Sequence, residues 1–337
     1  MKSFSIIENV TLSLSNISTE IYPLLKSIRS DWTQSNTRLV TFTEGLANII
    51  LGLFDTRNSD DDSNALIIKI YGAQTELYID RQSEINTMNI LSEQHVFSQR
   101  VLIHFNNGII YEYVSGKACS RDDVRKENIA QLIAIKLAQF HNVPIVKTEK
   151  PYIILILRKF IELLNGSSFD LTSIISDINA LDEHILPRLV PNAEFGKELV
   201  LCHNDLVVKN IIYNEKDQSV SFIDFEYAHI NYALFDIANH FVEYAGGDDT
   251  DFSLYPDRDE QKRWLKIYFQ TRGMHQQTIN DDLCHLIDQF SALSFLMWGL
   301  WGLVQAQISQ IDYDYITYAN IRLDYYKNLR PLLFEKD

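Results

Sequence analysis

The chain has 337 residues, of which 46% are hydrophobic and 22% are charged, and its formal net charge is −15. This length is enough for a large core and for two lobes. The acidic balance disfavours a nucleic-acid-binding protein, because such proteins carry a basic stripe along the phosphate backbone. Glycine (12 residues) and proline (7 residues) are scarce, so a long flexible linker is not expected.

The cysteines and the apolar stretches indicate a cytoplasmic protein. Cys119, Cys202 and Cys284 form an odd, dispersed set, which disfavours a disulfide framework or a zinc site and favours a reducing compartment. The N-terminus lacks the uninterrupted apolar core of a signal peptide. Residues 290–304 are the most apolar stretch, but they fall short of the ~20 residues of a membrane span. We therefore expect a buried helix there and no membrane insertion.

The first 35 residues are expected to be mostly helical. Ile21, Leu24, Leu25 and Ile28 recur at the spacing of one helix face. Beyond the first strands, the polar segment 58–64 with its three aspartates predicts a solvated turn.

Strands dominate the prediction for the rest of the N-terminal third. An apolar run with Lys69 in its interior predicts a strand, and Glu84 lies in a predicted helix. The Asn107-Gly108 pair between two apolar runs is a strong hairpin signal. The predicted strands cover residues 39–42, 49–54, 66–71, 100–105 and 109–114, and the helix covers residues 80–95.

Helices dominate the prediction for the remainder of the chain. An amphipathic helix is expected over residues 125–141, and more helices follow it. Short strands are predicted on either side of Asp205 and Asp224, and helices again up to the C-terminus. This order predicts an N-terminal lobe over residues 1–115 and a mostly helical lobe over residues 116–337.

The segment 202–227, CHNDLVVKNIIYNEKDQSVSFIDFEY, carries the most informative pattern. Asp205 lies in a polar loop, Asn210 follows five residues later, and Asp224 ends an apolar strand-like run. Phosphoryl transfer in kinase-like folds needs one carboxylate to accept the proton of the attacking hydroxyl, and an amide with a second carboxylate to hold Mg²⁺. An incidental turn aspartate explains one such acid, but it does not explain three groups in this order.

The chain resembles the choline/ethanolamine kinase family over residues 38–327. The resemblance is carried by HNDLVVKNIIYN, FIDFEYAHINYALFDIANHFVEYAG, DFSLYPDR and WGLWGLVQAQIS. It implies an α+β fold of the two-lobed protein-kinase-like, aminoglycoside phosphotransferase-like type. The lobe of residues 1–115 would bind the nucleotide, and the lobe of residues 116–337 would carry the catalytic loop and an amino-alcohol pocket.

The resemblance also implies roles for individual residues in binding MgATP. Asp205 would be the catalytic base, and Asn210 and Asp224 would bind Mg²⁺, which agrees with the preference of Mg²⁺ for oxygen ligands. His203 is expected to brace the loop, since H-x-D lacks the spacing of a zinc site. Lys69 would contact phosphate with Glu84 as its partner; the alternative is a solvent-facing strand residue. Arginine is common at this position in the family, so lysine is a departure.

Further contacts of the nucleotide are implied in the N-terminal lobe. Asn48 and the backbone of the loop 43–48 would cover the phosphates, although a loop with one glycine is a weak signal by itself. The inter-lobe hinge would be 111–114, with adenine bound by main-chain groups of Tyr113 and Val114.

The acceptor pocket is predicted from aromatic residues and one carboxylate. A small organic cation requires an aromatic cage and an anionic partner. The candidates are Tyr227, Glu243, Tyr244, Trp298 and Trp301. Core packing is the alternative explanation of the Trp-x-x-Trp stripe, and the upstream motif favours the cage.

The resemblance implies ATP-dependent phosphorylation of ethanolamine to phosphoethanolamine, with ATP and Mg²⁺ as cofactors and a small molecule as partner. Choline kinase or dual activity is the first alternative, because a cage for trimethylammonium also accepts a primary ammonium. A catalytically inactive protein on the same fold is a lesser one. Asp236 is expected to stabilise the catalytic loop. The sequence leaves a homodimer open.

Overall fold

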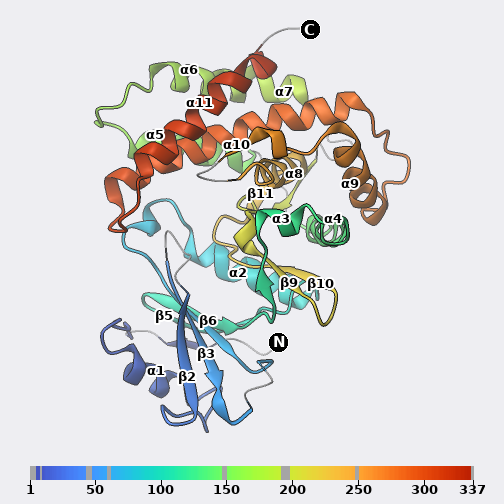
Figure 1. The fold of residues 1–337 in the computed structure, drawn as a ribbon. Coiled ribbons are helices and arrows are strands. Elements are labelled where there is room, and N and C mark those ends of the chain that lie inside the picture. The colour runs from blue at the N-terminus through green and yellow to red at the C-terminus, as the bar shows by residue number, and fades with distance from the viewer. Residues whose placement is uncertain are drawn as a thin grey trace. The chain divides into compact units, whose positions relative to one another are not determined.

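The computed structural model describes residues 5–7, 10–42, 48–58, 62–145, 150–190, 198–246 and 250–334 (Figure 1). The chain divides into two units. The first contains residues 1–116 and 309–311, and the second contains residues 117–308 and 312–337.

The first unit is built on a six-stranded sheet with the order β1-β5-β6-β4-β3-β2. β1 pairs in parallel with β5, and the other neighbours are antiparallel. The strands are β1 (Ser5–Ile7), β2 (Thr37–Phe42), β3 (Ile49–Asp55), β4 (Leu66–Ile70), β5 (Val101–Phe105) and β6 (Gly108–Glu112). The hairpin predicted at Asn107-Gly108 joins β5 to β6, and a Cβ atom on Gly108 would lie 2.1 Å from the carbonyl oxygen of Lys69. Glycine is therefore required at this position.

The expectation of a mostly helical N-terminus is wrong for part of its length. Ser5–Ile7 forms β1, and the helix α1 covers only Ile17–Leu25. The predicted apolar face is nevertheless in the core, because Ile21, Leu24 and Leu25 are buried against the sheet. A strand of three residues gains its hydrogen bonds from β5, which is far away in sequence, so local periodicity could not predict it.

Helix α2 (Arg81–Glu93) follows the short 3₁₀ helix Thr75–Leu77. The side chain of Asp80 caps α2 by accepting hydrogen bonds from the backbone of Gln82 and Ser83. Of the predicted polar turn 58–64, residues 59–61 lie outside the described residues; Thr56–Asn58 forms a 3₁₀ turn.

The second unit is mostly helical and contains two small sheets. One sheet has the order β10-β9-β7, and the other pairs β8 with β11. The strands are β7 (Lys117–Ala118), β8 (Leu199–Cys202), β9 (Ile211–Asn214), β10 (Ser219–Phe222) and β11 (His229–Tyr232). The helices are α3 (Arg121–Val124), α4 (Glu127–His141), α5 (Tyr152–Leu163), α6 (Thr172–Ala180), the π-helical turn Leu181–Ile185, α7 (Leu186–Leu189), α8 (Ala233–Val242), α9 (Arg258–Thr271), α10 (Asp281–Ile308) and α11 (Tyr315–Phe334), with 3₁₀ turns at Val208–Asn210 and Phe252–Leu254.

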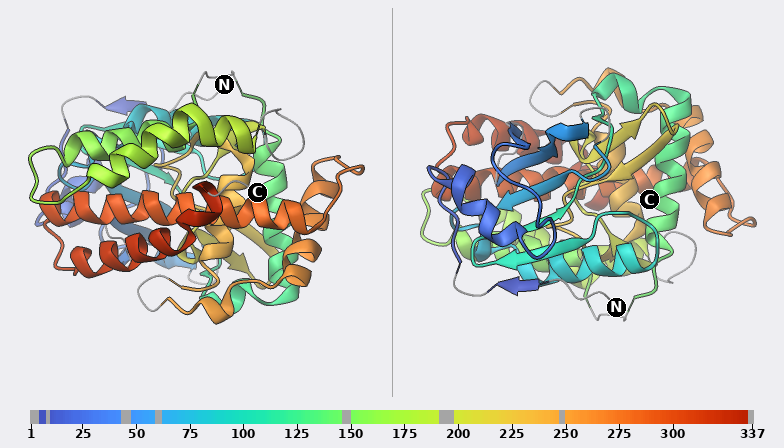
Figure 2. Two further views of the ribbon diagram at one scale, coloured as in Figure 1. Left: turned by 90° about the horizontal axis from the view of Figure 1, so that it is seen from above. Right: turned by 90° about the horizontal axis from the view of Figure 1, so that it is seen from below.

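Helix α10 is the centre of the second unit. Among the described residues it alone has the length and apolarity to cross a membrane, but 89% of its most apolar window is buried inside the protein. The predicted buried helix over residues 290–304 is therefore confirmed. Figure 2 shows α10 and α11 running side by side. Gly299 and Gly302 permit this close approach, because Cβ atoms there would lie 2.7 Å from Leu323 and 3.0 Å from Ala319.

The DFSLYPDR motif ties α9 to α10. Asp257 caps α9 in a capping box with Glu260. Arg258 forms an ion pair of 2.5 Å with Asp288 of α10, and the Tyr255 hydroxyl donates to the same carboxylate at 3.0 Å. The motif thus has a structural role in holding these helices together.

Candidate active site

A loop between β8 and β9 holds the first two residues of the predicted constellation. The Asn210 amide nitrogen donates hydrogen bonds to the Asp205 carbonyl oxygen at 2.9 Å and to its Oδ2 at 3.1 Å. The backbone N–H of Val207 also donates to the Asp205 carbonyl oxygen, at 2.9 Å. The bond to Oδ2 orients the carboxylate of Asp205, which is partly buried, and the other two hold its backbone.

The β9–β10 hairpin brings Asp224 to this loop. Ile211 is paired with Phe222, and one step further the backbone N–H of Ile223 donates to the Asn210 carbonyl oxygen at 2.9 Å. Asp224 therefore follows directly on the residue paired with Asn210. Its φ of +64° lies in the left-handed region, which non-glycine residues seldom occupy and which is common at functional sites.

Acidic side chains are concentrated around Asp205. Burial raises the pKa of Asp205 well above its usual value, and the negative charges of Asp224, Glu226 and Glu243 raise it further, while the hydrogen bond from Asn210 opposes them. Glu226 was not among the predicted site residues, although it lies two positions after Asp224 and is buried. Such a cluster of carboxylates is suited to binding a cation.

Asp236 of α8 holds the backbone of the loop that precedes Asp205, as expected from the sequence. Its Oδ2 accepts from the backbone N–H of His203 at 2.6 Å, and its Oδ1 accepts from that of Asn204 at 2.7 Å. Asn204 has a φ of +64°, so a strained residue directly before Asp205 is anchored by a charged acceptor. His203 braces the loop in the predicted way, because its Nε2 is 2.9 Å from the Ile223 carbonyl oxygen.

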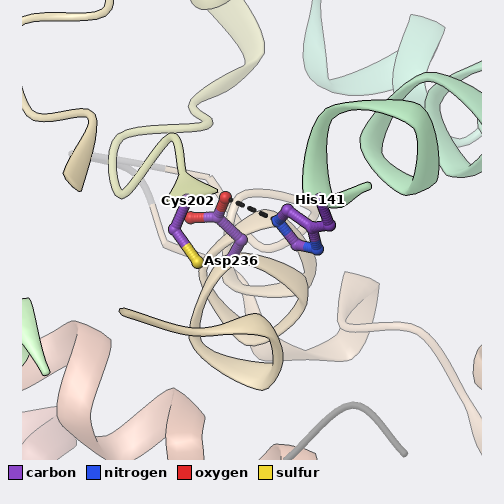
Figure 3. Close-up of side chains that lie close together, drawn as sticks. All are labelled: His141, Cys202 and Asp236. Carbon is purple, nitrogen blue, oxygen red and sulfur yellow. Dashed lines mark hydrogen bonds and ion pairs between the residues drawn. The ribbon is translucent and has the colours of Figure 1, made fainter. Parts of the chain in front are cut away.

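Behind this anchor lies a buried group of His141, Cys202 and Asp236 (Figure 3). Their ligand-type atoms lie within 4.8 Å of one another, which is close enough for a metal site. The groups already have hydrogen-bond partners, however. His141 contacts Asp236 at 3.1 Å and the Tyr268 hydroxyl at 2.7 Å, and the Cys202 thiol donates to a backbone carbonyl at 3.4 Å. Burial raises the pKa of Cys202 well above its usual value, so the thiol is a donor and the group is structural.

Asp236→Asn is expected to destabilise the protein by about 1–3 kcal/mol, because one of its two acceptor oxygens becomes an amide that faces a backbone N–H. The midpoint of urea unfolding measures this loss. Asp312→Asn, at an exposed position before α11, is the matched control and should leave the midpoint unchanged. An unaltered midpoint in Asp236→Asn would show that the anchor has no energetic role.

In the first unit, the predicted pair of Lys69 and Glu84 is present. The Lys69 ammonium lies 2.6 Å from Glu84 Oε1, and both side chains are almost fully buried. The alternative of a solvent-facing lysine is therefore wrong. Tyr113 follows β6, and its backbone N–H donates to the Ala65 carbonyl oxygen at 3.1 Å; Val114 follows it as a partly buried residue.

The proposed phosphate-covering loop falls largely outside the described residues, since 43–47 are not described. Its last residue, Asn48, is buried at the start of β3. The Asn48 Oδ1 accepts from the backbone N–H of Gly72 at 3.3 Å and from Arg81, a residue that the sequence analysis did not single out, at 3.1 Å.

In the second unit, three of the predicted cage residues come together. The Trp298 and Trp301 rings are edge-to-face at 5.8 Å, and Tyr227 packs against Trp298 in the same manner at 5.4 Å. The Trp298 indole N–H donates to Asn239 Oδ1 at 2.8 Å, which fixes the orientation of the ring.

The same aromatic wall continues onto residues that the sequence analysis missed. Tyr315 and Tyr318 both contact the Trp301 ring at 5.8 Å. The structure places Tyr244 differently, because its ring contacts His240 at 5.3 Å and Phe241 at 5.9 Å. Both of these contacts are to residues of α8, whereas the Trp298 ring contacts Tyr227 and Trp301.

Glu243 directly follows the last residue of helix α8, as its C-cap, and is buried. The Arg322 guanidinium of α11, which the sequence analysis also missed, is 3.5 Å from Glu243 Oε1 and is itself only 2% exposed. This distance is long for a charge-assisted hydrogen bond. Glu243 therefore has a nearby cation but is not held in a short ion pair by it.

Comparisons with known proteins identify the family. The model of the choline/ethanolamine kinase family matches residues 39–327. The chain belongs to this family. It is 34% identical to human ethanolamine kinase 1, covering 91% of this chain and 71% of that protein. It is 36% identical to a probable ethanolamine kinase of Nematostella vectensis, covering 91% of this chain and 92% of that one.

Solved structures show the same fold. An ethanolamine kinase from Plasmodium vivax superposes with a TM-score of 0.78 at 24% identity, covering 96% of this chain and 92% of that one. A choline kinase from Cryptosporidium parvum gives a TM-score of 0.76 at 20% identity, covering 92% and 94%. The predicted kinase-like α+β fold is therefore confirmed. As a member of this family, the chain is a kinase that binds a nucleotide and acts on a small molecule.

Proposed function

We propose that this chain is an ethanolamine kinase, which transfers the γ-phosphoryl group of ATP to the hydroxyl of ethanolamine and releases phosphoethanolamine and ADP. This reaction is the first step of the CDP-ethanolamine route to phosphatidylethanolamine. The observation that carries the proposal is the hydrogen-bonded pair of Asp205 and Asn210, with Asp224 next to the residue that pairs with Asn210, in a chain whose relatives are named ethanolamine kinases. The intact set also argues against a catalytically inactive protein.

Asp205 is the general base in this proposal. Its carboxylate accepts the proton of the ethanolamine hydroxyl while that oxygen forms a bond to the γ-phosphorus and the bond to the ADP oxygen breaks. The hydrogen bonds from Asn210 keep the carboxylate in one orientation, so the proton is taken at a defined position.

The donor set around Asp205 fits Mg²⁺. Asn210 donates through its amide nitrogen to Asp205, which leaves Oδ1 as the atom that would hold the cation together with the Asp224 carboxylate. When bound, Mg²⁺ neutralises charge on the phosphates of ATP. The repulsion among Asp205, Asp224 and Glu226 supports this assignment, because a cation would relieve it.

In the first unit, Lys69 and Asn48 are proposed to contact the phosphates, with Glu84 orienting Lys69. Main-chain groups of Tyr113 and Val114 are proposed to bind adenine. Because these last contacts use the backbone, side-chain substitutions there test them poorly.

The acceptor site is proposed to consist of Tyr227, Trp298 and Trp301 with Glu243 as the anionic partner, and Tyr318 extends the same aromatic wall. The faces of aromatic rings attract a small cation. Tyr244 is left out of this site because its ring lies in a different cluster.

A coupled assay of ADP release tests the proposal with ethanolamine, its mono- and dimethylated forms and choline as acceptors. We expect the highest kcat/KM with ethanolamine and a decrease with each added methyl group. A preference for choline would make the chain a choline kinase. No acceptor-dependent ADP release with any of the four would support the inactive alternative.

Glu243→Gln is expected to lower kcat/KM for ethanolamine more than for choline and so to narrow the preference. A primary ammonium offers three N–H donors and choline offers none. Losing a charged acceptor for such a donor costs about 1–3 kcal/mol. Trp298→Ala should instead lower kcat/KM for both amino alcohols, through lost cation–π attraction and packing.

The control for this comparison is Glu215→Gln, an exposed position in the β9–β10 turn, which should leave the ratio of the two kcat/KM values unchanged. If Glu243→Gln also leaves that ratio unchanged, this account of selectivity is wrong, although the kinase assignment would stand.

A further inference from the structure

Arg81, the first residue of α2, lies at the meeting point of three segments of the first unit. Its guanidinium donates to Glu84 Oε2 at 3.1 Å, to Asn48 Oδ1 at 3.1 Å and to the Thr75 hydroxyl at 2.5 Å. The Tyr71 ring lies 4.2 Å from the guanidinium carbon, in cation–π geometry. These contacts join the start of β3, the turn after β4 and the first turn of α2.

The carboxylate of Glu84 is shared between two cations. Oε1 contacts the Lys69 ammonium at 2.6 Å, while Oε2 contacts Arg81 at 3.1 Å. The Glu84 side chain is only 1% exposed, and these contacts help to set its orientation. Arg81 thus contacts Oε2 of the carboxylate, and Oε1 is the oxygen that meets Lys69. Without Arg81, the carboxylate could rotate and draw Lys69 onto both oxygens.

Arg81 also determines the orientation of the Asn48 side chain. Asn48 Oδ1 accepts from both Arg81 and the backbone N–H of Gly72. With the oxygen held in this way, the amide nitrogen becomes the group that Asn48 presents as a donor. Phosphate oxygens accept hydrogen bonds, so this orientation favours a phosphate and the flipped amide would repel it.

We propose that Arg81 is a positioning residue for nucleotide binding, which sets Lys69 through Glu84 and sets the amide of Asn48 directly, so that both side chains meet the phosphates of the nucleotide. This inference rests on the proposed function, because it takes ATP as the ligand of Lys69 and Asn48. The positioning role depends on the planar guanidinium of Arg81. The guanidinium N–H groups donate to Glu84, Asn48 and Thr75 at the same time, whereas a lysine ammonium is a point charge on a flexible stem.

Arg81→Gln and Arg81→Lys test the proposal, with MgATP affinity measured by titration calorimetry in the absence of an acceptor. Arg81→Gln should raise the Kd for MgATP by about 10-fold or more, since it removes charge-assisted hydrogen bonds. The KM for MgATP should rise by a similar factor, while the KM for ethanolamine stays within about twofold. Arg81→Lys should fall between the wild type and Arg81→Gln.

The control is Arg57→Gln, which removes another arginine of the same unit. Arg57 pairs with Asp55 at 2.6 Å and Asp31 at 2.8 Å on the surface, so its loss should leave MgATP affinity unchanged. A merely structural role of Arg81 predicts a different outcome: a lower thermal midpoint and a lower kcat, with the Kd and KM for MgATP unaltered.

A double-mutant cycle of Arg81→Gln and Glu84→Gln gives the second test. Two losses of MgATP affinity are compared: the loss that Arg81→Gln causes in the wild type, and the loss that it causes in a chain that already carries Glu84→Gln. If Arg81 acts largely through Glu84, the second loss should be clearly smaller than the first. Additive losses, or a Kd of Arg81→Gln within about twofold of the wild type, would overturn the proposal. If Arg81→Gln does not fold, unaltered affinity in Arg81→Lys overturns it. A wild type that binds MgATP but phosphorylates no amino alcohol would refute the proposed function alone.

Discussion

Asp205→Asn is expected to lower kcat by about 10²–10⁴-fold, which is the usual contribution of a general base. Asparagine has nearly the same shape but cannot accept the proton of the acceptor hydroxyl. The bonds from Asn210 and Val207 to the backbone carbonyl at position 205 do not depend on the carboxylate, so the loop should keep its conformation. Steady-state kinetics with saturating ethanolamine measure the loss, and calorimetry should show MgATP binding largely intact.

Asp217→Asn provides the control for this prediction. Asp217 is an exposed residue of the β9–β10 turn, where its carboxylate accepts from the Asn214 amide at 2.9 Å. Its substitution should leave kcat unchanged. If Asp205→Asn retains more than about a tenth of the wild-type rate, the role assigned to Asp205 is wrong.

Asp224→Ala is expected to abolish Mg²⁺-dependent ATP binding, and Asn210→Ala is expected to weaken it. Mg²⁺ is held in such sites by few protein oxygens, so the loss of one carboxylate removes much of its attraction. Calorimetric titration of MgATP measures both effects. Asp224 has a φ of +64°, where alanine adds backbone strain.

Asp224→Asn separates the charge from this strain, because asparagine tolerates the left-handed conformation. It should lose Mg²⁺-dependent affinity as Asp224→Ala does. ATP titrated in excess EDTA is the reference, and the variants should approach that weaker binding. Wild-type affinity for MgATP in both Asp224→Ala and Asn210→Ala would refute the metal assignment.

The arrangement of Asp205, Asn210 and Asp224 could be predicted from the sequence because these residues are close together in the chain. Asn210 is five residues from Asp205, and one hairpin carries the chain from Asn210 to Asp224. Local turn and strand propensities therefore decide this geometry. The Lys69–Glu84 pair could be predicted for a related reason, since a charge inside a fully apolar strand must be compensated when it is buried.

The residues that the sequence did not reveal owe their position to the tertiary structure. Arg322 is 79 positions from Glu243 and reaches it because α11 packs against α10 at Gly299 and Gly302. Tyr244 is aromatic, as a cage residue must be, but the ring contacts that the structure gives it are with His240 and Phe241. Arg81 is three residues from Glu84, yet its contact with Asn48 spans 33 positions.

The amino-acid sequence by itself determined the family, the division into a strand-rich and a helical part, and the residue types and spacing on which the proposed chemistry of the Asp205 loop rests. Those features depend on local periodicity and on short spacings, which are legible in the chain. The tertiary structure alone decided which cations share a buried carboxylate and which aromatic rings meet. Long-range packing determines such contacts, because the partners of a side chain lie on helices and strands that are distant in sequence and come together only when the core forms.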